Sequence, residues 1–543
     1  MKQVLKESWT RLVRIWRLIL QARLPQAYFP KYSILVVISL LILLSLFYGF
    51  QNILFLRPQG LHQWRQCDCL SLTMNYYQDS NRFFEPAMHN LGEDGTGKTA
   101  NDFPILYYTI AQIWKLFGPH EFIYRLMNIL IMFAGLALLM KMTEHFLKDS
   151  YWAIIMVLFL FTSPTLVYYT NNFLTNITAF GLVLVAWYFF YSHYQNNSTR
   201  SYILFFVFFA LAGLLKISSL LSLLALLALI ILHHLIHLVK KEGSTPVFRR
   251  TNLIGFILVL AMVSSWYIYA RFYNGRHNDG YFLIGILPIW DADWNHITRI
   301  FNAIKDHLKH AYFHPVMSWS LVFMWFFNIL FYKRTNPFLL GLTILTTLGM
   351  ISFGLLFYQA LEQHDYYMIN QMILVPLIII AFLDLLKQRF PYLYHALMIR
   401  LLFVVLLIFC MAFTRTHINY RYSPDGWENE NRTLYTYGLE TIEPYLDSIG
   451  VGKEIKVICG TDHSINISLY LMNRKGWTGF NLHDDSLMID SKIEEGARIM
   501  MAYEKKGTDL KWMTPFININ DKVGQYQNIS IFTLGMPDLK QGP

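Results

Sequence analysis

The sequence predicts an α-helical membrane protein that crosses the bilayer about eleven times and ends in a small α/β domain. Of its 543 residues, 55% are hydrophobic and 17% aromatic, which is more apolar surface than one soluble core could bury. Apolar runs of about twenty residues recur along the chain, and such a run spans the ~30 Å hydrocarbon core of a bilayer. Charged residues and Asn return after Thr416, where the last apolar run ends.

The N-terminal segment, residues 1–32, is basic. Residues 1–31 carry seven Lys or Arg and a single acid, Glu7. Cytoplasmic segments collect Lys and Arg, so we expect the N-terminus in the cytoplasm. Apolar residues recur at helical spacing from Leu12 to Ile19, with arginines between them. This pattern predicts an amphipathic helix on the inner leaflet.

The transmembrane module is predicted to cover residues 33–415. Its spans are expected at 33–50, 124–141, 152–170, 175–193, 202–219, 221–238, 253–270, 316–332, 337–357, 368–386 and 399–415. With the N-terminus inside, alternation places most basic loop residues in the cytoplasm: Lys240, Lys241, Arg249, Arg250, Lys333, Arg334, Lys387, Arg389 and Arg400. The net charge of +10 is therefore explained by membrane topology, and no nucleic-acid partner is expected.

The first outer loop, residues 51–123, concentrates the polar chemistry. Its stretch from Arg57 to Pro104 holds six carboxylates and two histidines in a chain that is only 15% charged. Loops this long are usually functional or disordered, and this one is too aromatic for disorder. We therefore expect the reaction site here. Ile105–Phe117 is apolar but too short to span the bilayer, and Trp290–Phe313 alternates apolar and charged residues at helical spacing. Both are interpreted as juxtamembrane helices.

The C-terminal segment, residues 416–543, is predicted to be an extracytoplasmic (periplasmic) α/β domain. Strands are expected at Ile455–Cys459, Arg498–Tyr503 and Asn528–Leu534. Helices are expected near Thr433–Leu446 and Ser464–Asn473, with another before the second strand.

Five motifs occur in order along the chain: HQWRQCDCLSLTMNYY, NDFP, GPHEFIYRL, HDYYMINQMILVP and LYLMNRKGW. Together they resemble the glycosyltransferase C superfamily and are similar to its bacterial aminoarabinose and protein O-mannosyl transferase branch. The resemblance implies a sugar donor linked to a polyprenyl phosphate, an inverting transfer and a catalytic acid in the first outer loop.

Three residues are candidates for the catalytic base: Asp68 first, then Asp102 and His62. An acceptor hydroxyl that attacks an anomeric carbon needs a base within hydrogen-bonding reach, and an outer-loop carboxylate can supply one. Where other branches of the family have an Asp-Glu pair, this sequence has His62-Gln63, which leaves the base open among the three. Each is alternatively a solvated loop residue or a helix cap.

The donor phosphate gains negative charge as the glycosidic bond breaks, so fixed cations are expected around it. Lys216 is predicted near the outer end of its span, and ionisable residues within spans are usually functional. Arg65, Arg125 and Arg271 are further candidates. The alternative for each is a membrane anchor that reaches to the interface.

His364, Asp365 and Tyr366 precede a late span. Aromatic belts explain tyrosines at that depth but not the adjacent His and Asp, so we expect them to contact the donor phosphate or sugar. Acids from the first loop could complete an oxygen-rich shell for Mg²⁺ or Mn²⁺ around this pair. The sequence leaves metal dependence open.

The sequence thus predicts a glycosyltransferase of the bacterial inner membrane that transfers a sugar to a hydroxyl of a lipid, glycan or protein at the outer face. A transporter or flippase of lipid-linked sugars would also explain the spans, but it would place charges near the bilayer midplane. A membrane-anchored binding or sensor protein would leave the acids of the first loop unexplained.

Overall fold

The fold is described from a computed structural model. The residues described are 22–79, 82–240, 253–278, 280–283, 285–423, 426, 438–482, 485–503, 511–517 and 521–534. The predicted amphipathic helix around Leu12–Ile19 lies outside them.

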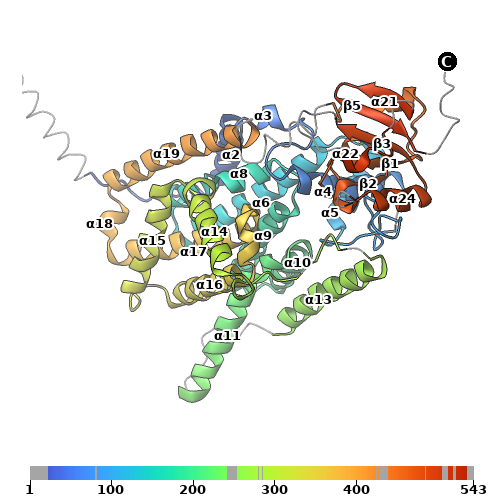
Figure 1. The fold of residues 1–543 in the computed structure, drawn as a ribbon. Coiled ribbons are helices and arrows are strands. Elements are labelled where there is room, and N and C mark those ends of the chain that lie inside the picture. Colours follow the sequence, from blue (N-terminus) through green and yellow to red (C-terminus); the bar gives the residue numbers. More distant parts are fainter. Residues whose placement is uncertain are drawn as a thin grey trace, which may run out of the picture.

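Long apolar helices form the body of the protein (Figure 1). In the described part of the chain, seven helices are long and apolar enough to cross a membrane, or up to nine if each of two bent pairs counts as one span. The single segments are α6 (Phe122–Leu147), α9 (Thr175–Asn196), Ile217–Ile236, α13 (Leu253–Arg276), α16 (Pro337–Leu356), Asp365–Arg389 and α19 (Leu397–Tyr422). Ile217–Ile236 includes most of α11 (Leu221–Lys240), and Asp365–Arg389 ends with α17 (Leu374–Arg389). Two shorter apolar helices are α2 (Ser33–Phe47) and α10 (Thr199–Leu215). Every predicted span falls on one of these helices or on a bent pair.

Two helix pairs are sharply bent, whereas the sequence predicted straight spans. Residues 152–170, expected as one helix, form α7 (Ser150–Leu160) and α8 (Pro164–Thr170), which meet at 81°. Pro164 lacks an N–H and begins α8, and the Ser163 hydroxyl accepts from the Leu166 N–H as its cap (3.3 Å). The second pair is formed by the helical segment Trp294–Tyr312 and α15 (Pro315–Leu330), which meet at 101°.

Short helical segments connect these elements. The segment before α15 consists of α14 (Trp294–His307) and the π-helix η3 (Leu308–Tyr312). The remaining short helices of the body are α3 (Phe50–Ile53), η1 (Ile217–Leu220), η2 (Ile289–Asp291), η4 (Tyr358–Glu362), η5 (Asp365–Met368), η6 (Asn370–Ile373) and α18 (Pro391–Tyr394).

The first loop contains a largely buried helix. Its helix α4 (Gln63–Gln78) is covered on all sides, with every residue from Gln66 to Tyr76 buried. The helix predicted at Ile105–Phe117 is confirmed as α5, at the expected bounds.

The C-terminal domain contains a five-stranded sheet of order β2-β1-β3-β5-β4. Strand β1 (Lys456–Cys459) pairs in parallel with β2 (Gly476–Thr478) and β3 (Ala497–Tyr503), while β5 (Ile529–Thr533) is antiparallel to β3 and to β4 (Lys522–Tyr526). The three predicted strands are confirmed; β2 and β4 were not predicted. The helices are α21 (Glu443–Ser448), α22 (Ile467–Met472), α23 (Gly479–Leu482), α24 (Ser486–Glu494) and η7 (Lys511–Met513). Of the predicted helix Thr433–Leu446, residues 433–437 lie outside the described residues, and α21 begins within the described part.

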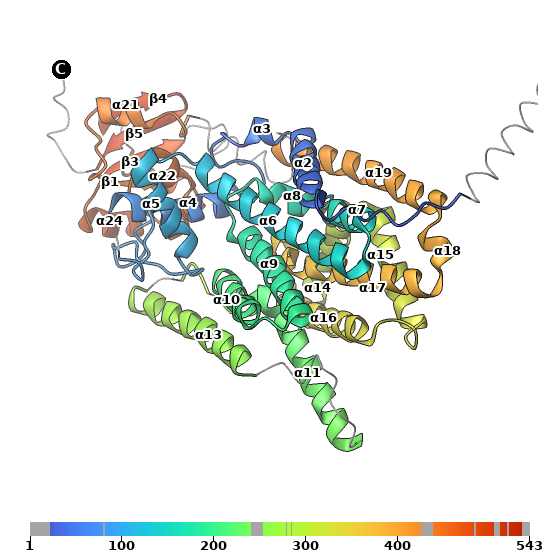
Figure 2. The ribbon, with the colours of Figure 1, turned by 180° about the vertical axis from the view of Figure 1, so that it is seen from behind.

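The sheet packs directly against the first loop, and both ribbon views show it beside α4 and α5 (Figures 1 and 2). Asn90 forms a parallel bridge with Gly476, and the Trp477 indole N–H donates to the Gly92 carbonyl (2.7 Å). Apolar side chains of α4, α5, β1 and β3 share one buried cluster. The C-terminal domain therefore forms part of the surroundings of the first loop.

Candidate active site

Asp102 is the centre of the first polar cluster, which we call the Asp102 cluster. Lys216 Nζ lies 3.0 Å from Asp102 Oδ1, and Arg65 Nη2 lies 3.1 Å from Oδ2. The hydroxyls of Thr175 and Tyr107 also donate to Oδ2, at 2.7 and 3.2 Å. Both oxygens of this carboxylate are thus engaged, and only 3% of Asp102 is exposed.

Asp102 is contacted by side chains from four elements: α4, α5, α9 and the end of α10. Thr175 is the first residue of α9, and Lys216 follows α10, where an extended backbone ends the helix before η1. Burial alone would raise the pKa of Asp102, but Lys216 and Arg65 hold that pKa below its usual value. Asp102 is therefore ionised at neutral pH and is a weak proton acceptor in this state.

Asp68 lies one helical turn beyond Arg65 on α4 and is also buried. Its Oδ2 is 3.8 Å from Arg65 Nη1, and its Oδ1 accepts from Asn466 Nδ2 of the C-terminal domain at 3.1 Å. The Arg65 guanidinium therefore lies between two carboxylates, Asp68 and Asp102.

A second group, the Asp365 cluster, contains Asp365, Arg421, His62, Thr165 and Tyr169. Arg421 Nη2 lies 2.6 Å from Asp365 Oδ2, which also accepts from the Thr165 hydroxyl (3.0 Å). The Tyr169 hydroxyl donates to Oδ1 (2.7 Å), and His62 Nε2 lies 3.5 Å from the same oxygen. His62 adopts the left-handed conformation (φ 56°, ψ 37°) immediately before α4. A non-glycine residue in this region is uncommon, and such residues cluster at functional sites.

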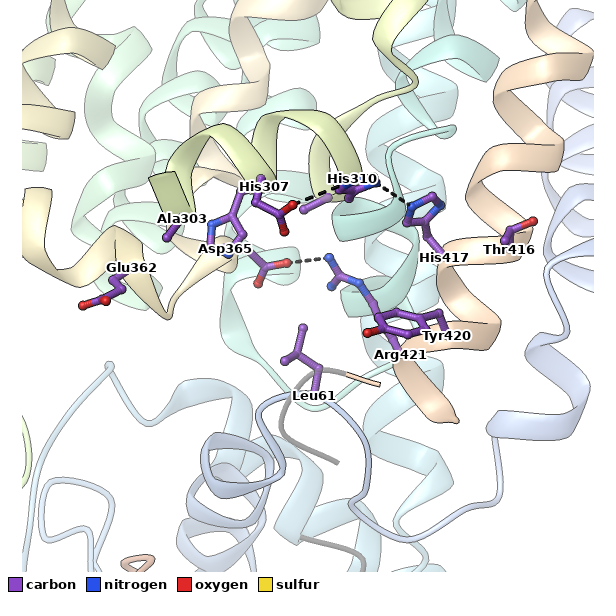
Figure 3. Close-up of a pocket in the computed structure, with 12 residues that line it drawn as sticks. Leu61, Ala303, His307, His310, Glu362, Asp365, Thr416, His417, Tyr420 and Arg421 are labelled. Carbon is purple, nitrogen blue, oxygen red and sulfur yellow. Dashed lines mark hydrogen bonds and ion pairs between the residues drawn. The ribbon is translucent and has the colours of Figure 1, made fainter. Parts of the chain in front are cut away.

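A cavity of about 610 Å³ lies beside the Asp365 cluster (Figure 3). In the figure, Arg421 of α19 points toward Asp365, and His310 of η3 and His417 of α19 point toward each other. His310 Nδ1 of the π-helix lies 3.5 Å from His417 Nε2 of α19, and π-helical turns are frequent at functional sites. The lining residues are Leu61, Ala303, Asp306, His307, His310, Ala311, Glu362, Asp365, Thr416, His417, Tyr420 and Arg421.

The two clusters meet at the start of α4, where one helical turn separates His62 from Arg65. The ring of His62 lies 5.0 Å from that of Tyr366 and 5.6 Å from that of His364, between centroids. Burial, with a smaller effect of His62, lowers the pKa of His364 to about 3. His364 is therefore neutral at pH 7 and offers a hydrogen bond but no positive charge.

The structure thus brings most of the predicted site residues into two adjoining clusters. Arg125 is engaged elsewhere: it is fully buried, and its guanidinium donates to the carbonyls of Ile53, Leu56 and Asn171 at 3.0 to 3.1 Å. Arg271 is exposed on α13. Contact of these two arginines with substrate stays a prediction.

The residues of these clusters that sequence reasoning missed include Thr165, Tyr169, Thr175, Arg421 and Asn466. Arg421 lies shortly after the last predicted span, where an arginine is usually an interfacial anchor. Nothing in the local sequence around these residues indicates their partners, because each partner is distant along the chain; Asn466 and Asp68 are 398 residues apart.

The Mg²⁺ or Mn²⁺ shell considered from the sequence does not assemble. Among the described residues, no group of three or more His, Cys, Asp or Glu side chains is arranged to hold a metal ion. Asp365 is surrounded by Arg421 and two hydroxyls, while the acids of the first loop, Asp68 and Asp102, are paired with cations. These carboxylates do not fit a shared divalent site.

Several solved structures have a similar fold. ArnT from Cupriavidus metallidurans, solved with undecaprenyl phosphate, matches with a TM-score of 0.59 at 12% identity, over 93% of this chain and 99% of ArnT. The mycobacterial arabinofuranosyltransferase AftD matches with a TM-score of 0.55 at 12% identity, over 95% of this chain and 41% of AftD. The Archaeoglobus fulgidus oligosaccharyltransferase gives a TM-score of 0.50 at 13% identity, over 86% of this chain and 68% of that enzyme.

At 12 to 13% identity, these likenesses show that the chain shares the fold of those proteins. Residues 101–269 match the family model described as dolichyl-phosphate-mannose-protein mannosyltransferase. That segment begins next to Asp102 and includes Thr175 and Lys216. No curated protein sequence matches the chain significantly.

Proposed function

We propose that the protein transfers a sugar from a polyprenyl-phosphate donor to an acceptor hydroxyl. The observation that carries the proposal is the adjacency of two groups: the cations Lys216 and Arg65 around Asp102, and the His62-Asp365 pair beside the 610 Å³ cavity. The first group suits a phosphate and the second suits a hydroxyl that must lose a proton. The ArnT structure, with its undecaprenyl phosphate, supports a lipid phosphate as the carrier.

Lys216 and Arg65 would bind the donor phosphate. Charge develops on this group as the sugar leaves, and cations fixed in advance stabilise such charge with little reorganisation. Asp68 and Asp102 balance the two cations, so long-range attraction is weak and binding depends on direct contact. The Lys216 side chain is 19% exposed, which gives a phosphate oxygen access to it.

Of the three candidate bases, we propose His62, which reverses the order expected from the sequence. Its partner Asp365 lines the cavity and is kept ionised by Arg421. An imidazole beside a fixed carboxylate can accept a proton, and the carboxylate then stabilises the imidazolium. Asp68 and Asp102 would instead hold Arg65 and Lys216 in place.

The reaction would proceed in one displacement. The acceptor hydroxyl gives its proton to His62 while its oxygen forms a bond to the anomeric carbon. The bond from that carbon to the phosphate oxygen breaks on the opposite face, and its electron pair goes to the phosphate beside Lys216. The anomeric configuration is inverted.

The acceptor would lie in the cavity. Its lining mixes carboxylates, histidines, a tyrosine and an arginine with small apolar residues, a combination that suits a polar group bearing hydroxyls. A lipid, a glycan and a protein side chain all present such a hydroxyl, so the acceptor class stays open.

We further propose that this chemistry takes place at the outer face of a bacterial inner membrane. The distribution of basic loop residues supports a cytoplasmic N-terminus and an extracytoplasmic C-terminal domain. The first loop and the C-terminal domain, which pack together, would then share the outer face.

A vesicle assay tests the proposal against its rivals. Purified protein is reconstituted with a radiolabelled polyprenyl-phosphate sugar and membrane extract as the source of acceptor. Transfer of label to an acceptor, lost in His62→Gln, would support the glycosyltransferase. Two helix pairs are bent, and broken helices also occur in transporters. Movement of label across the membrane without transfer would therefore indicate a flippase. The absence of both transfer and movement would favour a binding or sensor protein.

A further inference from the structure

The C-terminal domain reaches the first loop through the fully buried side chain of Asn466. Its Nδ2 donates to Asp68 Oδ1 at 3.1 Å, and its Oδ1 accepts from the backbone N–H of Asn90 at 3.0 Å. One carboxamide therefore contacts both α4 and the loop that follows it.

From Asn466, polar contacts continue without a break to the end of α10. Asn466 lies 3.1 Å from Asp68, Asp68 lies 3.8 Å from Arg65, Arg65 lies 3.1 Å from Asp102, and Asp102 lies 3.0 Å from Lys216. Donors and acceptors alternate along this series. The placement of the Arg65 guanidinium between its two carboxylates thus depends on where Asp68 is held.

The segment that carries Asn466 is fixed within its own domain. The Asp462 carboxylate accepts from the backbone N–H groups of Ser464 and Ser468, both at 2.8 Å. The Ser464 hydroxyl accepts from the N–H of Ile467 at 2.9 Å. These contacts shape the turn that presents Asn466 to Asp68, and the Asn90 side chain of the first loop also donates to the Ile465 carbonyl of this turn (2.8 Å).

A carboxamide is suited to this position. It donates a hydrogen bond to Asp68 without carrying a charge, so the full negative charge of Asp68 remains available to Arg65. A lysine or arginine here would compete with Arg65 for that carboxylate, and an apolar residue would leave one of its oxygens without this partner.

We propose that Asn466 is a positioning residue for donor binding: through Asp68 it sets the Arg65 guanidinium, and so the C-terminal domain takes part in holding the donor phosphate. The inference rests on the proposed function, because it assumes that Arg65 contacts a lipid phosphate.

Asn466→Asp tests this with a readout that a purely structural role would not produce. Two carboxylates in contact resist joint ionisation, so one of their pKa values rises. At low pH a shared proton replaces the lost N–H donor, whereas at high pH the carboxylates repel and Asp68 shifts from Arg65. We expect the affinity for undecaprenyl phosphate, relative to the wild type at the same pH, to fall roughly tenfold at pH 8.5 and to recover as the pH falls below the raised pKa of the pair; tenfold corresponds to about one unit of pKa difference between the free and the bound protein. Taking the ratio cancels the titration of the ligand itself.

Asn481→Asp is the matched control. Asn481 belongs to the same domain and contacts Tyr281 and Asn90, so it receives the same chemical change in another setting. Its affinity ratio should not depend on pH. A folded Asn466→Asp protein whose ratio is equally independent of pH would overturn the inference.

The exchange variant Asp68→Asn/Asn466→Asp keeps the test decisive if the single variant does not fold. It retains one carboxylate and one carboxamide at the contact, and we expect it to bind undecaprenyl phosphate more tightly than Asp68→Asn alone. Equal binding by the two would contradict the inference. A wild-type protein that binds no undecaprenyl phosphate would instead count against the proposed function.

Discussion

Replacing Lys216 by Met should separate donor binding from folding. The substitution keeps a flexible apolar stem and removes the amine that lies 3.0 Å from Asp102 Oδ1. Asp102 keeps its contacts with Arg65, Thr175 and Tyr107, so the protein should still fold and insert. The donor phosphate would lose one charge-assisted hydrogen bond, which contributes about 1.5–3 kcal/mol. This corresponds to a roughly 10- to 150-fold weaker affinity.

Equilibrium binding of undecaprenyl phosphate to the protein in detergent measures this loss directly. Lys216→Arg is the control, because it retains the positive charge and should bind within a few-fold of the wild type. If Lys216→Met bound with unchanged affinity while remaining monodisperse, the reasoning would be refuted, and Lys216 would serve only to balance Asp102.

Three further predictions concern the base, a buried histidine and the topology. His62→Gln should lower the rate of transfer on the order of 10²- to 10⁴-fold, the usual contribution of a general base, with little change in donor affinity; near-normal turnover would return the assignment to Asp68. Burial lowers the pKa of His89 to about 3, so the folded protein resists protonation there, and the stability held above about pH 6.5 is lost as pH falls toward 3. Thermal unfolding should show a loss of about 2 kcal/mol between pH 7.5 and pH 5 that His89→Gln removes; parallel pH curves would contradict this. A reporter active only outside the cytoplasm should work when fused after Ser423 and fail at Lys241, and the reverse pattern would overturn the proposed outer-face site.

Much of the helical body could be predicted from local sequence because apolar runs of membrane length are unambiguous. The bounds of α5 also follow from its sequence, since Pro104 and Gly118 flank thirteen residues that are largely apolar. The break between α7 and α8 was missed although Ser163-Pro164 is a helix-start signal; the hydrophobicity of the run outweighed it. Strands β2 and β4 are short and lack alternation, so no periodic signal indicates them.

Many residues of the candidate site could be predicted from the sequence, but the contacts between them could not. A lone cation in an apolar span led to Lys216, yet its ion pair with Asp102 joins residues 114 positions apart, and no spacing rule predicts it. Likewise, His62 and Asp365 lie far apart along the chain, and no local pattern predicts that they pair. The ranking of Asp68 above His62 rested on carboxylates being common bases, and it could not include the burial and cation contacts that the folded chain gives Asp68.

The central claim is that the protein cleaves the bond between a sugar and a polyprenyl phosphate. Release of polyprenyl phosphate from a radiolabelled lipid-linked sugar, with membrane extract as the acceptor source, measures this cleavage directly. The account predicts several moles of polyprenyl phosphate released per mole of wild-type protein, with matching label in the acceptor fraction, and release near background for His62→Gln. Equal release by the two proteins would contradict the proposed base, and no release by the wild type with any of a panel of such donors would contradict the claim itself.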